Sequence, residues 1–286
     1  MKISTEIYGT AKITGARKAV ELCGKAGFDA WDFSMFDMHK LVKLPLPCKH
    51  QMVSRYYLSL AEDLKKIGLD NGIICNQSHA PFPVKSPAVR SVLKLAIECT
   101  AAAGGNICII HPDNNKTAEE NAELYFELLP FAKDCGVKIA TENMWNWDVL
   151  KNQSSFAACA TGEDFRRHID AVNDEFFVAC LDLGHAEMRG SGDGAVNMIK
   201  ALGPHLQALH IHDNDRHHDN HQIPFSMNID FIPIVKALKE IDYQGYFTLE
   251  ADAFMKPYNK SNALQGVIKL KESARKLADE FERMEI

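Results

Sequence analysis

Acidic and imidazole side chains recur where short apolar segments of this chain give way to loops. The six motifs are Ser78-His79-Ala80-Pro81, His111-Pro112-Asp113, Thr141-Glu142-Asn143, Asp182-Leu183-Gly184-His185, His210-Ile211-His212-Asp213 and Leu249-Glu250-Ala251-Asp252. Carboxylates and imidazoles bind divalent metals and move protons. One such residue alone is more often a hydrogen-bonded structural group. Recurrence at the ends of six segments favours a shared site.

These residues can share a site only if the segments that carry them are parallel strands. Eight segments read as strands, at residues 2–8, 28–33, 72–77, 106–111, 137–142, 176–182, 206–212 and 246–250. Stretches with helical apolar spacing separate them, and several end at glycine. Eight strands alternating with helices predict an α/β fold, a single (β/α)8 TIM barrel over residues 1–286. Barrel closure then gathers the strand ends on one face.

The chemistry expected on that face is metal-assisted proton transfer. Buried carboxylates and imidazoles are costly unless they are paired or bound to a metal. His210 and His212 share one face of their strand, because side chains alternate, so both are candidates to point inward. A metal near an adjacent hydroxyl and carbonyl polarises the carbonyl, and a carboxylate can then remove the acidified proton.

The six motifs, in this order and on these strands, resemble the xylose isomerase-like TIM-barrel superfamily of sugar isomerases, epimerases and endonuclease IV. The resemblance covers nearly the whole chain, and it is the ordered set of motifs that carries it. It implies a divalent metal held by one residue from each of the last four strands. Carried onto this chain, the ligands are Glu142, Asp182, His212 and Glu250. His212 is preferred to His210 because the following Asn214-Asp215 then fits the family spacing.

The resemblance also implies residues for substrate binding or a second metal. His185 follows Asp182 by three residues and matches such a histidine, while His79, His111, Asp219 and His221 match further zinc ligands of the nuclease branch. Two departures from the family pattern lie in the loop after His212. Pro224-Phe225-Ser226-Met227 replaces the usual Pro-Gly stretch, and His218 stands where ketose 3-epimerases carry an arginine.

The implied activity is that of a metal-dependent sugar or sugar phosphate isomerase or epimerase. It would abstract a proton next to a carbonyl through a metal-stabilised enediolate, with Glu142 and Glu250 as the catalytic carboxylates. Three carboxylates and one imidazole favour manganese, magnesium or cobalt, with zinc the remaining candidate. Trp145 is either an apolar platform for a sugar or part of the loop packing.

Three alternatives stay open at this stage. One is an endonuclease IV-like metal-dependent nuclease, and another is a keto-polyol dehydratase, a lyase of the same superfamily. The third is a binding protein that has kept the barrel and lost catalysis. The net charge of −6 argues against the nuclease, because binding to nucleic acid needs a cationic surface.

Composition narrows the location and the partners. No stretch of about 18 apolar residues is present, so we expect no membrane partner. The eight cysteines are scattered without a Cys-x-x-Cys pair, which predicts buried thiols in a reducing, cytoplasmic setting. The expected partner is a small-molecule sugar or sugar derivative and no nucleic acid, with homo-oligomer formation left open.

Overall fold

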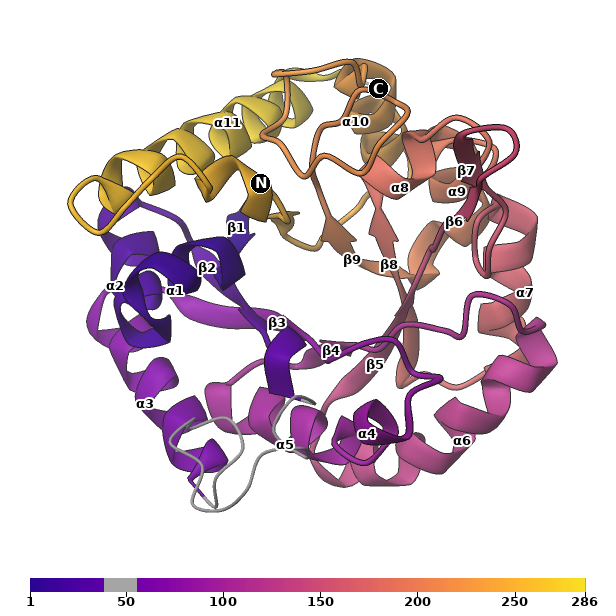
Figure 1. Ribbon diagram of the computed structural model, residues 1–286, viewed down its shortest axis with the longest axis horizontal. Coiled ribbons are helices and arrows are strands. Elements are labelled where there is room, and N and C mark those ends of the chain that lie inside the picture. Colours follow the sequence, from indigo (N-terminus) through magenta and orange to yellow (C-terminus); the bar gives the residue numbers. More distant parts are fainter. Residues whose placement is uncertain (39–55, 286) are drawn as a thin grey trace.

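The computed structural model describes residues 1–38 and 56–285, and it arranges them as a ring of parallel strands enclosed by helices (Figure 1). The strands of the ring are β1 (Ile3–Glu6), β2 (Ala30–Ser34), β3 (Ile74–His79), β4 (Ile107–Ile109), β5 (Lys138–Glu142), β8 (Phe177–Asp182), β9 (Leu206–His210) and β10 (Phe247–Leu249). All eight match the predicted strand segments. The prediction of a TIM barrel is therefore confirmed.

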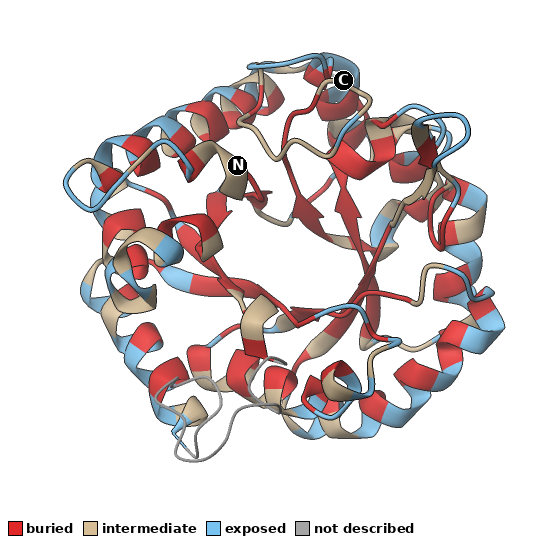
Figure 2. Cartoon of the chain, viewed as in Figure 1, coloured by how far each residue is buried: buried red, intermediate tan, exposed pale blue. Residues whose placement is uncertain are grey.

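The sheet closes on itself between its first and last strands. Its hydrogen-bonded order is β10-β1-β2-β3-β4-β5-β8-β9. Ile211 completes the ring beyond the end of β9, because its N–H donates to the Thr248 carbonyl over 2.9 Å and its own carbonyl accepts from the Glu250 N–H over 2.9 Å. Closure leaves the strands of the ring largely buried, as in other parallel barrels (Figure 2).

Helices surround the strands and bury an apolar face against them. They are α1 (Tyr8–Thr14), α2 (Ala16–Ala26), α3 (Tyr57–Asp70), α4 (Pro87–Arg90), α5 (Leu93–Ala103), α6 (Ala118–Asp134), α7 (Gly162–Val172), α8 (Leu183–Glu187), α9 (Ala195–Leu202), α10 (Phe231–Glu240) and α11 (Ala263–Arg283). Local sequence explains their starts: α6, for example, begins with a capping box formed by Thr117 and Glu120. The core between helices and strands includes Trp31 and Phe33, which face outward from β2.

The interior of the barrel changes from apolar to ionisable along the strands. Its apolar layer consists of Ile109, Ala140, Val178, Cys180 and Ala208. Because side chains alternate along a strand, the next inward positions after Ala140, Cys180 and Ala208 are Glu142, Asp182 and His210. The register places Asp182 directly beside His210. The alternation of side chains along the strands thus places a layer of ionisable residues next to a layer of apolar residues inside the barrel.

Two features lie outside the barrel pattern. The loop after β5 contains a short hairpin of β6 (Asn146–Asp148) and β7 (Gln153–Ser155). Seven cysteines fall within the described residues and are free thiols, while Cys48 lies outside them. Within residues 1–38 and 56–285, no helix has the length and apolarity to cross a lipid bilayer.

Candidate metal centre

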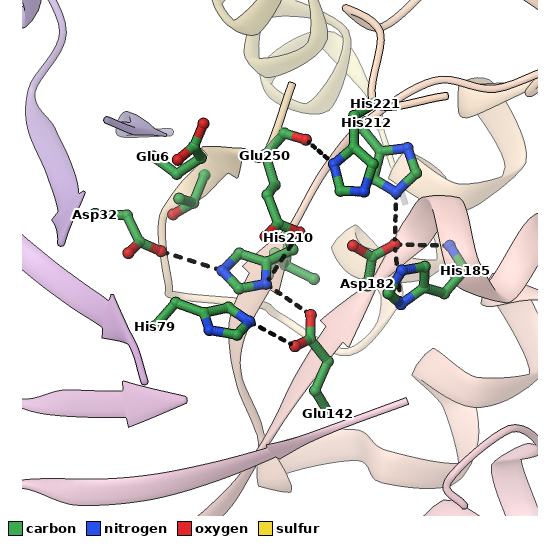
Figure 3. Close-up of polar contacts among 12 residues, drawn as sticks. Glu6, Asp32, His79, Glu142, Asp182, His185, His210, His212, His221 and Glu250 are labelled. Carbon is green, nitrogen blue, oxygen red and sulfur yellow. Dashed lines mark hydrogen bonds and ion pairs between the residues drawn. The ribbon is translucent and has the colours of Figure 1, made fainter. Parts of the chain in front are cut away.

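Ten ionisable residues from the predicted strand ends and the loop after β9 meet at the mouth of the barrel. They are His79, His111, Glu142, Asp182, His185, His210, His212, Asp219, His221 and Glu250, of which only Asp219 and His221 are partly exposed. Eight of them form two neighbouring groups, and His79 and His111 lie beside the first of these; Figure 3 shows members of both groups side by side.

The first group, here called the carboxylate group, consists of Glu142, Asp182, His210 and Glu250. One donor atom from each lies within 4.8 Å of the others. His210 Nδ1 is 2.6 Å from Glu142 Oε1 and 3.6 Å from Glu250 Oε2. The group is buried, so four metal-binding side chains share a small space that water reaches poorly.

Two further histidines meet the other oxygen of Glu142. His111 Nε2 lies 2.9 Å and His79 Nε2 3.4 Å from Glu142 Oε2. The two Nε2 atoms are also only 2.9 Å apart. Glu142 therefore has one oxygen toward the carboxylate group and one toward this histidine pair, which is the arrangement of a carboxylate that can bridge two metals.

The second group, here called the histidine group, consists of His185, His212, Asp219 and His221. Three Nε2 atoms surround the Asp219 carboxylate, at 3.4 Å from His185, 3.3 Å from His212 and 3.1 Å from His221. His212 Nε2 also lies 3.2 Å from Asp182 Oδ1, so Asp182 stands between the two groups.

Backbone contacts orient three of these rings toward the carboxylates. The Nδ1 atoms of His79, His185 and His221 lie 2.7, 3.0 and 2.7 Å from the carbonyl oxygens of Ala80, Asn143 and Glu250. A carbonyl only accepts, so each Nδ1 carries the proton. In a neutral ring the Nε2 lone pair then faces a carboxylate oxygen. Two acceptors at this distance need a proton or a metal between them.

The pKa values agree with protons filling that role when no metal is bound. Burial lowers the pKa of His185, but the charges of Asp182 and Asp219 outweigh it and raise that pKa to about 10. For Asp182, burial raises the pKa, but the charges of His185 and His212 outweigh it. They hold the pKa of this carboxyl group well below its ordinary value. His111 differs, since burial dominates and lowers its pKa to about 4.

The two glutamates of the carboxylate group shift in opposite directions. Burial raises the pKa of Glu142, but the charge of His210 and the contact with His111 overcome it and hold the pKa well below its ordinary value. Burial also acts on Glu250, where His210 and His221 offset it only in part, so its pKa is well above the ordinary value. One glutamate is set to be ionised and the other to be protonated.

The donor set fits a divalent metal on grounds that do not depend on the resemblance. Asp182 Oδ2 is buried and makes no hydrogen bond with any described residue. A buried, unpartnered carboxylate oxygen among other ligands costs free energy that a cation would recover. The three carboxylates of the first group suit manganese, magnesium or cobalt, and the imidazoles of the second suit zinc.

His210 and His212, the two candidate ligands predicted from the sequence, lie in different groups in the structure. His210 joins Glu142, Asp182 and Glu250, whereas His212, selected from the family spacing, joins His185, Asp219 and His221 while still contacting Asp182. The reason is their position along the strand direction: His210 is the last residue of β9, and His212 lies two residues beyond it. Two residues of extended chain span about 6.6 Å, so His212 lies nearer the loops.

Sequence reasoning missed Asp32, which lies fully buried beneath the carboxylate group. Its Oδ2 atom is 3.1 Å from His210 Nε2. The only signal was an aspartate at an inward position of the otherwise apolar segment Ala30–Ser34. Trp145 lies beside the histidine group, with its ring centroid 6.4 Å from that of His185.

A pocket of about 310 Å³ opens beside Glu250 and His221. Its other lining residues are Tyr8, Phe36, Asp37, Phe82 and Asp252. Of these five, only Asp252 stands in one of the six motifs, and together they come from loops after four different strands, β1, β2, β3 and β10. Aromatic and acidic side chains thus dominate the described wall of the pocket.

Comparisons with known proteins place the chain in a family. An uncharacterised protein of Methanocaldococcus jannaschii is 25% identical over 250 residues, covering 81% of this chain and 78% of the relative. An L-ribulose 3-epimerase of a Methylomonas species is 23% identical over 255 residues, covering 85% and 80%. The crystal structure of IolI protein with a bound zinc atom superposes with a TM-score of 0.73 at 19% identity, covering 99% and 100%. The sequence model of the family described as xylose isomerase-like TIM barrel matches residues 20–279, and the chain belongs to that family.

Proposed function

We propose that the chain is a divalent-metal-dependent isomerase or epimerase of sugars or sugar derivatives. The observation that carries the proposal is the pair Glu142 and Glu250, which approach His210 from β5 and from the end of β10, with Glu250 also lining an open pocket. Such an arrangement offers two proton carriers on different sides of one bound substrate. The similarity to an L-ribulose 3-epimerase supports the same reaction class.

The carboxylate group would hold the catalytic metal through Glu142, Asp182, His210 and Glu250. This assignment takes His210 in place of His212, because His210 lies level with the three carboxylates. The metal, when bound, supplies Lewis-acid polarisation of a substrate carbonyl. His212 then belongs with His185, Asp219 and His221, where a second metal or substrate hydroxyl groups would bind.

The protein's own part in the reaction is to move protons at carbon. Glu142 and Glu250 are the two groups that would accept a proton from carbon and return one, because they approach His210 from different strands of the barrel. Return to the opposite face of the same carbon gives epimerisation, and return at the neighbouring carbon gives isomerisation. A general base of this kind contributes about 10²- to 10⁴-fold in rate.

The pocket beside Glu250 supports a sugar as substrate. Tyr8 and Phe82 offer apolar surfaces for the C–H face of a sugar, and Asp252 is an acceptor for hydroxyl groups. Among the described residues that line it there is no lysine or arginine. A phosphodiester backbone would meet carboxylates there, which is unfavourable for nucleic acid.

Solvent exchange tests this proposal. The protein, loaded with Mn²⁺ in heavy water, is offered D-allulose, D-tagatose, D-fructose and L-ribulose, and the products are examined by NMR and mass spectrometry. We expect deuterium at the carbon next to the carbonyl, and loss of turnover in Glu142→Gln and Glu250→Gln. Full activity in both variants would refute the proposed roles. A product lighter by one water would identify a dehydratase instead.

The position of Glu142 favours one other function specifically. A carboxylate between His79 and His111 on one side and His210 on the other can bridge two metals, as in enzymes that cleave phosphodiesters. The test is a DNA duplex with an abasic site, incubated with the zinc-loaded protein. We expect no cleavage. Efficient cleavage that zinc restores after chelation would establish the nuclease and displace the epimerase.

A further inference from the structure

We propose that Asp32 is a positioning residue that fixes the ring of His210 so that Nδ1 faces the carboxylate group. The proposal rests on the metal-dependent function above, since His210 is taken as a ligand. Asp32 Oδ2 lies 3.1 Å from His210 Nε2, and His210 Nδ1 lies 2.6 Å from Glu142 Oε1. The three residues form one line across the barrel interior (Figure 3).

The contact spans strands that are not neighbours. Asp32 is on β2 and His210 on β9, and two strands, β1 and β10, lie between them in the ring. Both side chains have no exposed surface. A carboxylate buried inside a barrel costs free energy unless it is hydrogen-bonded, and the Nε2–H of His210 is one such partner for Asp32.

A second set of hydrogen bonds holds Asp32 in place. Gln77 Nε2 donates to Asp32 Oδ2 over 2.9 Å and lies 3.3 Å from the Leu209 carbonyl. The amide oxygen of Gln77 accepts from Asn76 Nδ2 over 3.2 Å and from Thr248 Oγ1 over 3.3 Å. Both the nitrogen and the oxygen of the Gln77 amide therefore have hydrogen-bond partners. Because the Gln77 side chain is held in this way, its hydrogen bond also fixes the position of Asp32 Oδ2.

The geometry determines which ring nitrogen can bind a metal. With Nε2–H donated to Asp32, a neutral His210 has its lone pair on Nδ1, toward Glu142 and Glu250. The ring plane is confined as well, because His79 stacks against it with centroids 5.3 Å apart and planes 14° from parallel. A carboxylate behind a ligating imidazole both orients the ring and makes it a stronger ligand.

Asp32→Asn tests the proposal by metal affinity. The variant keeps the shape of the side chain but removes its charge and half of its acceptor capacity. We expect Mn²⁺ to bind about 10- to 100-fold more weakly in calorimetric titrations, the range for partners of metal ligands. The control is Asp29→Asn, which removes the same charge at an exposed position; among the described residues, the Asp29 side chain accepts one hydrogen bond, from the Ile3 N–H. Its affinity should change less than about twofold.

Proton NMR provides a second readout, which does not depend on a bound metal. In ¹⁵N-histidine-labelled wild-type protein we expect a downfield, slowly exchanging proton on His210 Nε2, assigned by its loss in His210→Gln. If no such proton is found, or if Asp32→Asn leaves both it and the Mn²⁺ affinity unchanged, the positioning role is refuted. A wild-type protein that shows this proton but binds no Mn²⁺ would refute the metal-dependent function and leave the Asp32–His210 hydrogen bond established.

Discussion

His210 and His212 are two residues apart, and their rings face different carboxylates. His210 Nδ1 lies 2.6 Å from Glu142 Oε1, and His212 Nε2 lies 3.3 Å from Asp219 Oδ1. Asp182 links the two groups through its side chain, and the Glu250 carbonyl does so through its contact with His221. The mouth of the barrel therefore has a deeper, oxygen-rich group and an outer, nitrogen-rich group, each with its own preference among divalent metals.

His210→Gln and His212→Gln should therefore affect different metals. We expect His210→Gln to weaken Mn²⁺ binding at least tenfold, because it removes a ligand level with the three carboxylates. His212→Gln should lower zinc content and leave Mn²⁺ affinity within about threefold. Elemental analysis and calorimetric titration of both variants measure this. If the effects were exchanged, His212 would be the partner of Glu142 and Glu250, as the family spacing implies.

Sequence patterns were sufficient to predict the barrel and the strand ends that meet at its mouth. Period-two alternation and the position of each motif at a strand end determine that Glu142, Asp182 and Glu250 point inward. They do not determine how far along the barrel axis each of these side chains lies relative to the histidines. The register between β8 and β9 shifts between Ala179 and Cys180, and this irregularity brings Asp182 level with His210. A one-residue shift of this kind leaves no trace in composition or periodicity.

Contacts across the barrel could likewise not be predicted from the sequence. Asp32 is 178 residues from His210 along the chain, and only closure of the ring brings them together. The hairpin after β5 is another example. Its Trp147 stacks on His218 with ring centroids 6.0 Å apart, so the tryptophan packs against the loop that carries Asp219. Neither contact follows from local propensity, because both depend on where distant segments are placed.

Glu6→Gln should change how stability depends on pH. Glu6 is buried, and burial together with the charge of Asp252 raises its pKa from 4.5 to about 7. Between these values the folded protein binds more protons than the unfolded chain. The free energy of unfolding therefore falls as pH rises through this range. This change in the free energy of unfolding is about 3.5 kcal/mol at 1.4 kcal/mol per pKa unit.

Glutamine keeps the acceptor for the Tyr8 N–H, over 2.6 Å in wild type, and cannot ionise. Urea unfolding of both proteins from about pH 4 to pH 8 measures the difference. We expect the variant to gain stability relative to wild type as pH rises, with most of the gain between about pH 5 and pH 7. Parallel pH curves for the two proteins would show that Glu6 keeps its ordinary pKa in the folded state.

Asp213→Asn should destabilise the loop that carries Asp219 and His221. Asp213 is fully buried, and its two oxygens accept from four backbone N–H groups, those of Asn214, Ser226, Met227 and Ile229. An amide nitrogen in place of one oxygen faces two of these donors. We expect a loss of about 3–5 kcal/mol in the free energy of unfolding, with faster proteolysis between residues 214 and 228.

The control for that variant is Asp230→Asn at the start of α10, which removes the same charge. Among the described residues, Asp230 accepts one such bond, from the Ile232 N–H over 3.1 Å, and asparagine caps a helix about as well as aspartate, so the substitution should cost less than about 1 kcal/mol. Equal losses in the two variants would mean that charge, and not the hydrogen bonds of Asp213, accounts for the effect.

Gly184→Ala should displace His212 and leave the carboxylate group in place. Gly184 is in the short helix α8, and a Cβ there would overlap the His212 imidazole. Overpacking of this kind costs about 1–3 kcal/mol, although alanine is otherwise the better helix former by about 1 kcal/mol. We expect lower zinc content with unchanged Mn²⁺ affinity. The double variant with His212→Ala separates the two effects, because without the imidazole the alanine at 184 has no ring to displace and should cost nothing. An equal cost in both backgrounds would show that the strain arises elsewhere in α8.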